Sequence, residues 1–126
     1  MSKFEDRIAG ILWENKINYK REKTFPDLRG GKFRYDFYLP DFSTIIECNG
    51  QQHYYEVWGG RAQFLKQQEN DRRKISYALA NNMKIYCIPY WEIKNLITLD
   101  DLFNKKFIAH SKWKNDLDWK EHEKNK

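Results

Sequence analysis

Four side chains able to do chemistry gather in residues 33–54, FRYDFYLPDFSTIIECNGQQHY. They are Asp36, Glu47, Gln51 and His53. The pattern predicts a strand, a tight turn and a second strand, which would place Asp36 and Glu47 on neighbouring strands. Mg²⁺ is commonly held by one or two carboxylates and shares its remaining positions with water and phosphate. The spacing therefore predicts that these two carboxylates bind a divalent cation.

The two carboxylates could also occur here without a metal. Asp36 could pair with Arg34 or a neighbouring lysine, and Glu47 could lie at an exposed edge. Glu47 nevertheless ends an otherwise apolar strand, where an unpaired buried carboxylate is costly. His53 follows closely and could reach the same place, where a neutral imidazole can accept a proton from water. A lone histidine is more often structural or on the surface.

Two helices are expected to flank these strands. Residues 3–15 carry apolar side chains at helical spacing, and Glu5 lies at the edge of that apolar stripe. Glu5 could form a capping box with Ser2, or it could lean toward the carboxylates.

Residues 61–81 predict the longest helix, with Asp71 on its buried side. Asp71 could pair with Lys74 or Arg34, or it could act in the site. Arg72, Arg73 and Lys74 place three cations on adjoining faces, which suits contacts with phosphates. A run of charges on a helix is, however, most often a solvated face.

Strands are expected at 17–25, 33–39, 44–48 and 84–88, and a short helix within 96–107 after Thr98 as N-cap. In the second strand Tyr35 and Phe37 should share one face. The whole predicts an α/β fold: a single domain with a central mixed sheet of about four or five strands, flanked by the first helix and the long helix. We assign residues 1–106 to this domain and 107–126 to a basic, tryptophan-containing tail or helix.

Composition sets further expectations. A chain of 126 residues with net charge +5 suits one compact domain with a polyanionic partner. Cys48 and Cys87 are expected to be small buried thiols in a reducing cytosol. The sequence has no 18-residue apolar run and no charged-then-apolar leader, so we expect a cytoplasmic protein without a membrane span.

Three blocks of sequence resemble the PD-(D/E)xK nuclease superfamily. They are FRYDFYLP around Asp36, IIECNGQQHY from Ile45 to Tyr54, and NDRRK around Asp71 followed by IYCIPYWEI. Within the superfamily the chain is similar to the branch of very-short-patch repair endonucleases and phage-type homing endonucleases, whose site pattern is Glu, Asp, x, His, Asp. The resemblance covers roughly residues 2–102 and implies a restriction-endonuclease-like fold.

The resemblance implies a role for each matched residue. The catalytic pattern falls on Glu5, Asp36, Glu47, His53 and Asp71. It implies Mg²⁺-dependent cleavage of DNA, with Mn²⁺ able to substitute, and a phage-encoded or bacterial intracellular source. Asp36, Glu47 and the Cys48 carbonyl would hold the metal, and His53 would be the general base. The residues expected to contact phosphate or DNA are Arg34, Gln51, Arg72, Arg73 and Lys74.

One departure from the superfamily pattern bears on catalysis. The usual lysine, two residues after the second acid, is Asn49 here, and an amide cannot serve as a cation. Either His53 takes that role, which we favour and the branch pattern implies, or Lys74 reaches in from the long helix. If neither does so, the chain would be a DNA-binding module without catalysis, or a subunit that acts only in a larger nuclease complex. A homodimer would allow cleavage of both strands.

Overall fold

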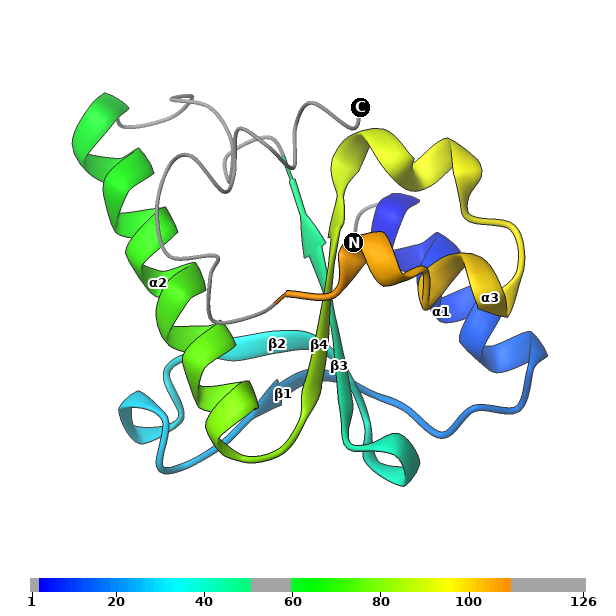
Figure 1. Cartoon of the computed structure of the whole chain (residues 1–126), viewed down its shortest axis with the longest axis horizontal. Helices are drawn as coiled ribbons and strands as arrows, with labels where there is room; N and C mark the ends of the chain where they lie inside the picture. Colours follow the sequence, from blue (N-terminus) through cyan, green and yellow to red (C-terminus); the bar gives the residue numbers. More distant parts are fainter. Residues whose placement is uncertain (1–2, 51–59, 110–126) are drawn as a thin grey trace.

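Two helices lie on opposite faces of a four-stranded sheet (Figure 1). The computed structural model describes residues 3–50 and 60–109. The helices and strands, in chain order, are α1 (Lys3–Glu14), β1 (Lys20–Thr24), β2 (Arg34–Leu39), β3 (Thr44–Asn49), α2 (Gly60–Ala80), β4 (Lys84–Pro89) and α3 (Leu99–Leu102). Short 3₁₀ turns join them: η1 (Arg29–Gly31), η2 (Pro40–Phe42), η4 (Tyr90–Asn95) and η5 (Lys105–Phe107).

The strands follow the order β1-β2-β3-β4. The pairs β1–β2 and β2–β3 are antiparallel, and β3–β4 is parallel. A parallel pair needs a long crossover connection, and α2 lies within it. The predicted single α/β domain with a mixed sheet between two helices is therefore confirmed.

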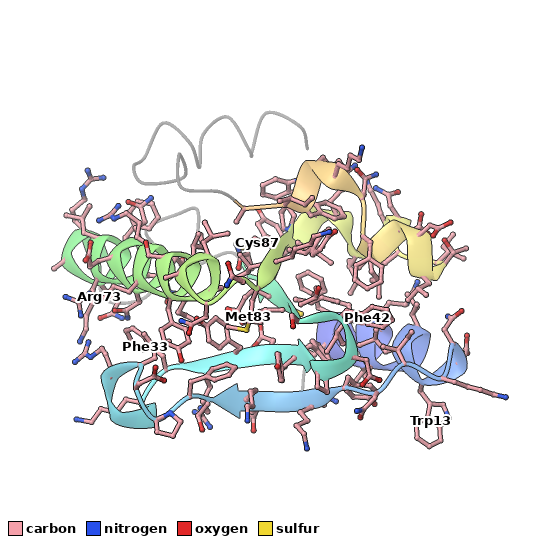
Figure 2. The ribbon with its side chains drawn as sticks, turned by 60° about the horizontal axis from the view of Figure 1, so that its bottom comes forward. Trp13, Phe33, Phe42, Arg73, Met83 and Cys87 are labelled. Atoms are coloured by element: carbon pink, nitrogen blue, oxygen red, sulfur yellow. The ribbon has the colours of Figure 1, made fainter. Side chains whose placement is uncertain are left out.

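The α1-side core contains the apolar stripe predicted for the first helix. Ile8 and Leu12 are fully buried, and they belong to one cluster with Phe37, Ile46 and Ile88 from three strands. Trp13, on the opposite side of the helix, is 76% exposed and points outward (Figure 2). The amphipathic pattern of α1 therefore fixes which of its faces packs on the sheet.

The α2-side core is apolar in only one half of the helix. Ile75 and Ala78 pack in a cluster with Ile45, Met83 and Cys87. Toward the N-terminus of α2, the buried positions are instead Gln68 and Asp71. Positions buried this deeply in a helix are normally apolar. The two polar side chains therefore distinguish this half of α2 from the half that packs in the apolar core.

The sequence-based assignment of faces in β2 is wrong at its first residues. Phe37 packs in the α1-side core, whereas Tyr35 packs in the α2-side core, although residues two apart share a face in a regular strand. Glu22, which lies on β1 between the partners of these two residues, has φ of 52°. This left-handed residue interrupts the regular backbone of β1 opposite the point where the side chains of β2 change face.

The region after β4 also departs from expectation. The helix expected within 96–107 is reduced to the four residues of α3 and the separate turn η5. Asp101 accepts the Thr98 and Ile97 amide hydrogens (2.7 and 2.8 Å) and fixes the start of α3. Ile108 then bridges Tyr86, and this antiparallel contact covers part of the outer edge of β4.

Two further expectations concern thiols and membranes. Cys48 and Cys87 are both free thiols, as predicted, although only Cys87 is fully buried. Within residues 3–50 and 60–109, no helix has the length and apolar character needed to cross a membrane.

Candidate active site

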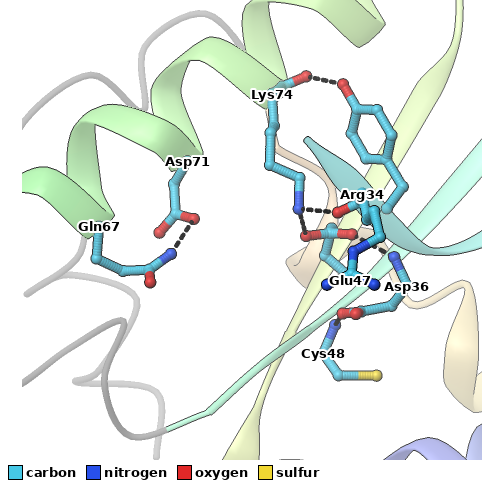
Figure 3. A network of polar contacts seen from close by, with 8 residues as sticks. Arg34, Asp36, Glu47, Cys48, Gln67, Asp71 and Lys74 are labelled. Atoms are coloured by element: carbon cyan, nitrogen blue, oxygen red, sulfur yellow. Dashed lines mark hydrogen bonds and ion pairs between the residues drawn. The ribbon is translucent and has the colours of Figure 1, made fainter. Parts of the chain in front are cut away.

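Asp36 and Glu47 meet where the main-chain pairing of β2 and β3 ends. The last paired residues toward this end are Phe37 and Ile46. Beyond them the Glu47 carboxylate accepts the Asp36 amide hydrogen, and the Asp36 carboxylate accepts the Cys48 amide hydrogen, both at 2.7 Å (Figure 3). Each side chain thus satisfies a main-chain donor of the opposite strand, and these reciprocal bonds fix both carboxylates in place.

Burial concentrates negative charge at this point. Glu47 is only 5% exposed, since β3 is a central strand, so the alternative of an exposed edge residue is wrong. Burial, and then the charge of Glu47, raises the pKa of Asp36 to about 7. Such a pair of carboxylates suits a cation, whose charge would offset the desolvation cost.

Lys74 reaches this pair from α2. Its ammonium lies 2.5 Å from Glu47 Oε2 and donates to the Arg34 carbonyl at 2.6 Å (Figure 3). Burial by itself would lower the pKa of Lys74. The charge and hydrogen bond of Glu47, with Asp36 and Asp71, outweigh burial and raise that pKa. The group beside Glu47 is therefore a charged ammonium at neutral pH, suited to donating hydrogen bonds rather than to accepting a proton.

Asp71 lies one turn before Lys74 on α2, on the inward face that the sequence predicted. It is 6% exposed and accepts a hydrogen bond from Gln67 at 3.1 Å. A cavity of about 10 Å³, near the size that one water needs, separates this part of α2 from the sheet. The residues that line the cavity are Glu47, Asn49, Asp71, Lys74, Ile75, Ile85 and Cys87.

Glu5 approaches the site from the opposite helix. Its carboxylate lies 3.6 Å from the Arg21 guanidinium, which stands over the Phe37 ring at 5.2 Å. The charge of Glu5 is also among those that raise the pKa of Asp36. The structure thus places Glu5 on the Asp36 side of the site, whereas the proposed cap with Ser2 falls outside the described residues.

The predicted phosphate-binding cations differ in their surroundings. Arg72 and Arg73 both bind Glu69, at 2.7 and 3.3 Å. Arg34 is 66% exposed and has a distant contact of 4.0 Å with Glu22. Of these four cations, only Lys74 forms an ion pair with a carboxylate of the candidate site within the described part of the chain.

Two predicted site residues, Gln51 and His53, lie outside the described residues, and their roles stay predictions. Asn49, at the position of the usual lysine, is 2% exposed and pairs with Pro89 in the sheet.

Sequence reasoning missed two residues that hold the site together. Gln67 binds Asp71, as described above. Tyr35 donates its hydroxyl hydrogen to the Lys74 carbonyl at 2.7 Å. In the sequence Tyr35 resembles any aromatic core residue, and only its position directly before Asp36 could have drawn attention to it.

The donor set fits a hard cation that retains water ligands. Among the described residues, no group of three His, Cys, Asp or Glu side chains is arranged to hold a metal. Asp36 and Glu47 supply two carboxylates, which is the usual protein contribution to a Mg²⁺ site. The Cys48 amide points toward β2, and in a strand the carbonyl of the same residue faces the same neighbour. A main-chain oxygen is therefore available beside the carboxylates.

Comparison with known proteins shows a structural similarity. No protein-family description and no curated protein matches the chain. Among solved structures, the chain is similar to the catalytic domain of the homing endonuclease I-Bth0305I. The TM-score is 0.53 at 22% sequence identity, over 75% of this chain and 83% of that one. At this identity the similarity establishes the fold: an α/β domain of the type found in an endonuclease catalytic domain.

Proposed function

We propose that the chain is a metal-dependent DNA endonuclease that hydrolyses phosphodiester bonds and, acting through one site, nicks one strand. The observation that carries this proposal is that Asp36, Glu47 and Lys74 meet where the main-chain pairing of β2 and β3 ends. The fold shared with an endonuclease catalytic domain supports it. The net charge of +5 is consistent with a DNA substrate.

Asp36, Glu47 and the Cys48 carbonyl would hold Mg²⁺, for which Mn²⁺ can substitute. The cation supplies Lewis-acid polarisation of the scissile phosphate when bound. The hydrogen bonds from the Asp36 and Cys48 amides orient the two carboxylates before the cation arrives. Such preorganisation lowers the cost of reaching the reactive geometry.

Lys74 and His53 divide the remaining roles. Lys74 remains an ammonium beside Glu47, so it serves as a hydrogen-bond donor that orients the attacking water or stabilises developing negative charge on the phosphate. A proton acceptor is then still required, and His53 is the candidate general base. Glu5 and Asp71 approach from α1 and α2, where they can orient water or the base.

A plasmid-nicking assay tests this proposal. Supercoiled DNA is incubated with the protein in Mg²⁺, Mn²⁺ or EDTA, alongside Asp36→Ala and the matched control Asp41→Ala. Asp41 is an exposed aspartate in the turn η2, at the other end of the hairpin. We expect metal-dependent open circles from the wild type and Asp41→Ala, and at least a 100-fold loss in Asp36→Ala. A folded Asp36→Ala variant with full activity would refute the proposal.

Asn49 motivates a second candidate function. Because the usual lysine is absent, the same fold could serve as a DNA-binding module without catalysis. This function predicts a salt-sensitive gel shift that persists in EDTA and no cleavage product with any divalent metal. Metal-dependent strand breakage that is lost in Asp36→Ala would exclude it.

A further inference from the structure

Tyr35 is a fully buried residue that contacts Lys74 in two ways. Its hydroxyl donates to the Lys74 main-chain carbonyl at 2.7 Å. The Lys74 ammonium stands over the Tyr35 ring, 5.0 Å from its centroid. The Tyr35 side chain therefore contacts Lys74 both at its main-chain carbonyl and at its ammonium group.

The remaining contacts of Lys74 define what this arrangement positions. The ammonium also donates to the Arg34 carbonyl and to Glu47. Arg34 and Tyr35 are consecutive on β2, directly before Asp36. A single segment of β2 thus determines where the ammonium of α2 lies relative to the carboxylates.

Tyr35 itself is held by aromatic packing. Its ring meets the Phe25 ring edge-on, with centroids 5.7 Å apart and an interplanar angle of 75°. Phe25 in turn contacts Tyr38 and Tyr77. Since Tyr77 belongs to α2, this aromatic cluster ties the same strand and helix together beside the hydroxyl bond.

A lysine side chain is flexible and by itself would sample many orientations. The face of an aromatic ring attracts an ammonium, and a hydrogen bond to the carbonyl fixes the helix at the lysine's own residue. We propose that Tyr35 is a positioning residue, which holds the Lys74 ammonium against Glu47 and thereby sets the rate of the cleavage step. This inference rests on the proposed nuclease function.

The test compares Tyr35→Phe, which removes only the hydroxyl, with the matched control Tyr38→Phe. Tyr38 lies on the same strand and also packs on Phe25. We expect Tyr35→Phe to lower kcat about 5-fold, the effect of one neutral hydrogen bond, with KM for DNA within twofold of the wild type. Tyr38→Phe should match the wild type. Equal kcat values for all three proteins would overturn the proposal.

A double-mutant cycle separates positioning from a general structural effect. If Tyr35 acts through Lys74, Tyr35→Phe should cause less than a twofold further loss in a Lys74→Met background. The same 5-fold loss in both backgrounds would show that Tyr35 acts independently of the lysine and would overturn the proposal.

A measurement on the protein alone distinguishes failure of this inference from failure of the nuclease function. An amine-reactive acylating reagent is added to the metal-free protein, and mass spectrometry follows each lysine. Tyr35→Phe should raise the labelling rate of Lys74 at least threefold and leave Lys106, which is held by the buried Glu92 at 2.8 Å, unchanged. Unchanged labelling of Lys74, or an equal rise at Lys106, would overturn the proposal even if the wild type cleaves DNA. A wild type that cleaves nothing would refute the nuclease function while this labelling still decides how Lys74 is held.

Discussion

Two effects act in opposite directions on the charge of the Asp36 carboxylate when no cation is bound. The hydrogen bond from the Cys48 amide favours the charged form, whereas burial beside Glu47 disfavours it. A proton relieves the repulsion at low pH, and a cation would relieve it at neutral pH. Protons and metal are therefore expected to compete for the same residue.

The raised pKa of Asp36 predicts how the stability of the metal-free protein depends on pH. The folded state retains this proton up to about pH 7, whereas the unfolded chain loses it near the ordinary value of 3.8. The folded state therefore binds more protons between these values, and the contribution of Asp36 to stability falls as pH rises from about 4 to 7. In EDTA, we expect Asp36→Asn to be more stable than the wild type at pH 8 and nearly equal to it at pH 4. Urea denaturation at both pH values measures this difference, and a difference that is independent of pH would contradict the prediction.

Lys74 is expected to stabilise the metal-free protein through Glu47. Lys74→Met would leave a carboxylate of 5% exposure without its cation, and breaking a buried pair typically costs about 3 kcal/mol. Urea denaturation in EDTA should show this loss, and added Mg²⁺ should restore more stability to the variant than to the wild type. Lys84→Met, at an exposed position of β4, is the control. An equal effect of Mg²⁺ on Lys74→Met and wild type would show that lysine and metal do not share Glu47.

At the scale of elements, local patterns predicted α1, α2 and all four strands. Each of these elements carries its own periodicity, because one face must be buried. The short segment after β4 was less predictable, since its length depends on Asp101 and on contacts with the sheet.

Some features of the site could be predicted from the sequence, and others could not. The meeting of Asp36 and Glu47 follows from hairpin pairing, which the sequence indicates. That Lys74 reaches Glu47 depends on the packing of α2 against the sheet, and the sequence left it as the less favoured alternative to His53. Tyr35 could not be assigned, because its face changes at a backbone irregularity that lies on the neighbouring strand.

The left-handed residue of β1 predicts the effect of a glycine. Glu22 has φ of 52°, which costs a residue with a Cβ about 1 kcal/mol, and glycine avoids this cost. We expect Glu22→Gly to increase the free energy of unfolding by up to about 1 kcal/mol. Lys20→Gly, on the same strand with ordinary φ, should decrease it. Denaturant titration measures both, and loss of stability in Glu22→Gly would show that the side chain contributes more than the backbone strain removes.

At the scale of the whole molecule, the charge pattern would set how strongly the proposed DNA substrate is attracted. Glu69 binds both Arg72 and Arg73, and these bonds compete with contacts between the two arginines and phosphates. Neutralising Glu69 would remove the carboxylate that binds both guanidinium groups. Their positive charge would then add fully to the electrostatic potential around the site.

We therefore expect Glu69→Gln to tighten DNA binding about 2- to 5-fold at low salt, with the gain disappearing as salt rises. Gel shifts in EDTA across a salt series measure this change. Glu14→Gln, at an exposed position at the end of α1, controls for net charge alone. An equal gain in both variants would show that the arginines are not held back by Glu69.

The left-handed residue Glu22 in β1 also bears on the tendency of the protein to aggregate. β1 is an outer strand of the sheet, and a regular outer strand offers unpaired main-chain groups on which another molecule can build fibrils. The charged sequence KREK and the reversed backbone at Glu22 make this edge a poor template. The glycine that relieves the strain would also remove a charge from this edge. A gain in folding stability would then be accompanied by faster aggregation at high concentration, which light scattering of the two proteins would detect.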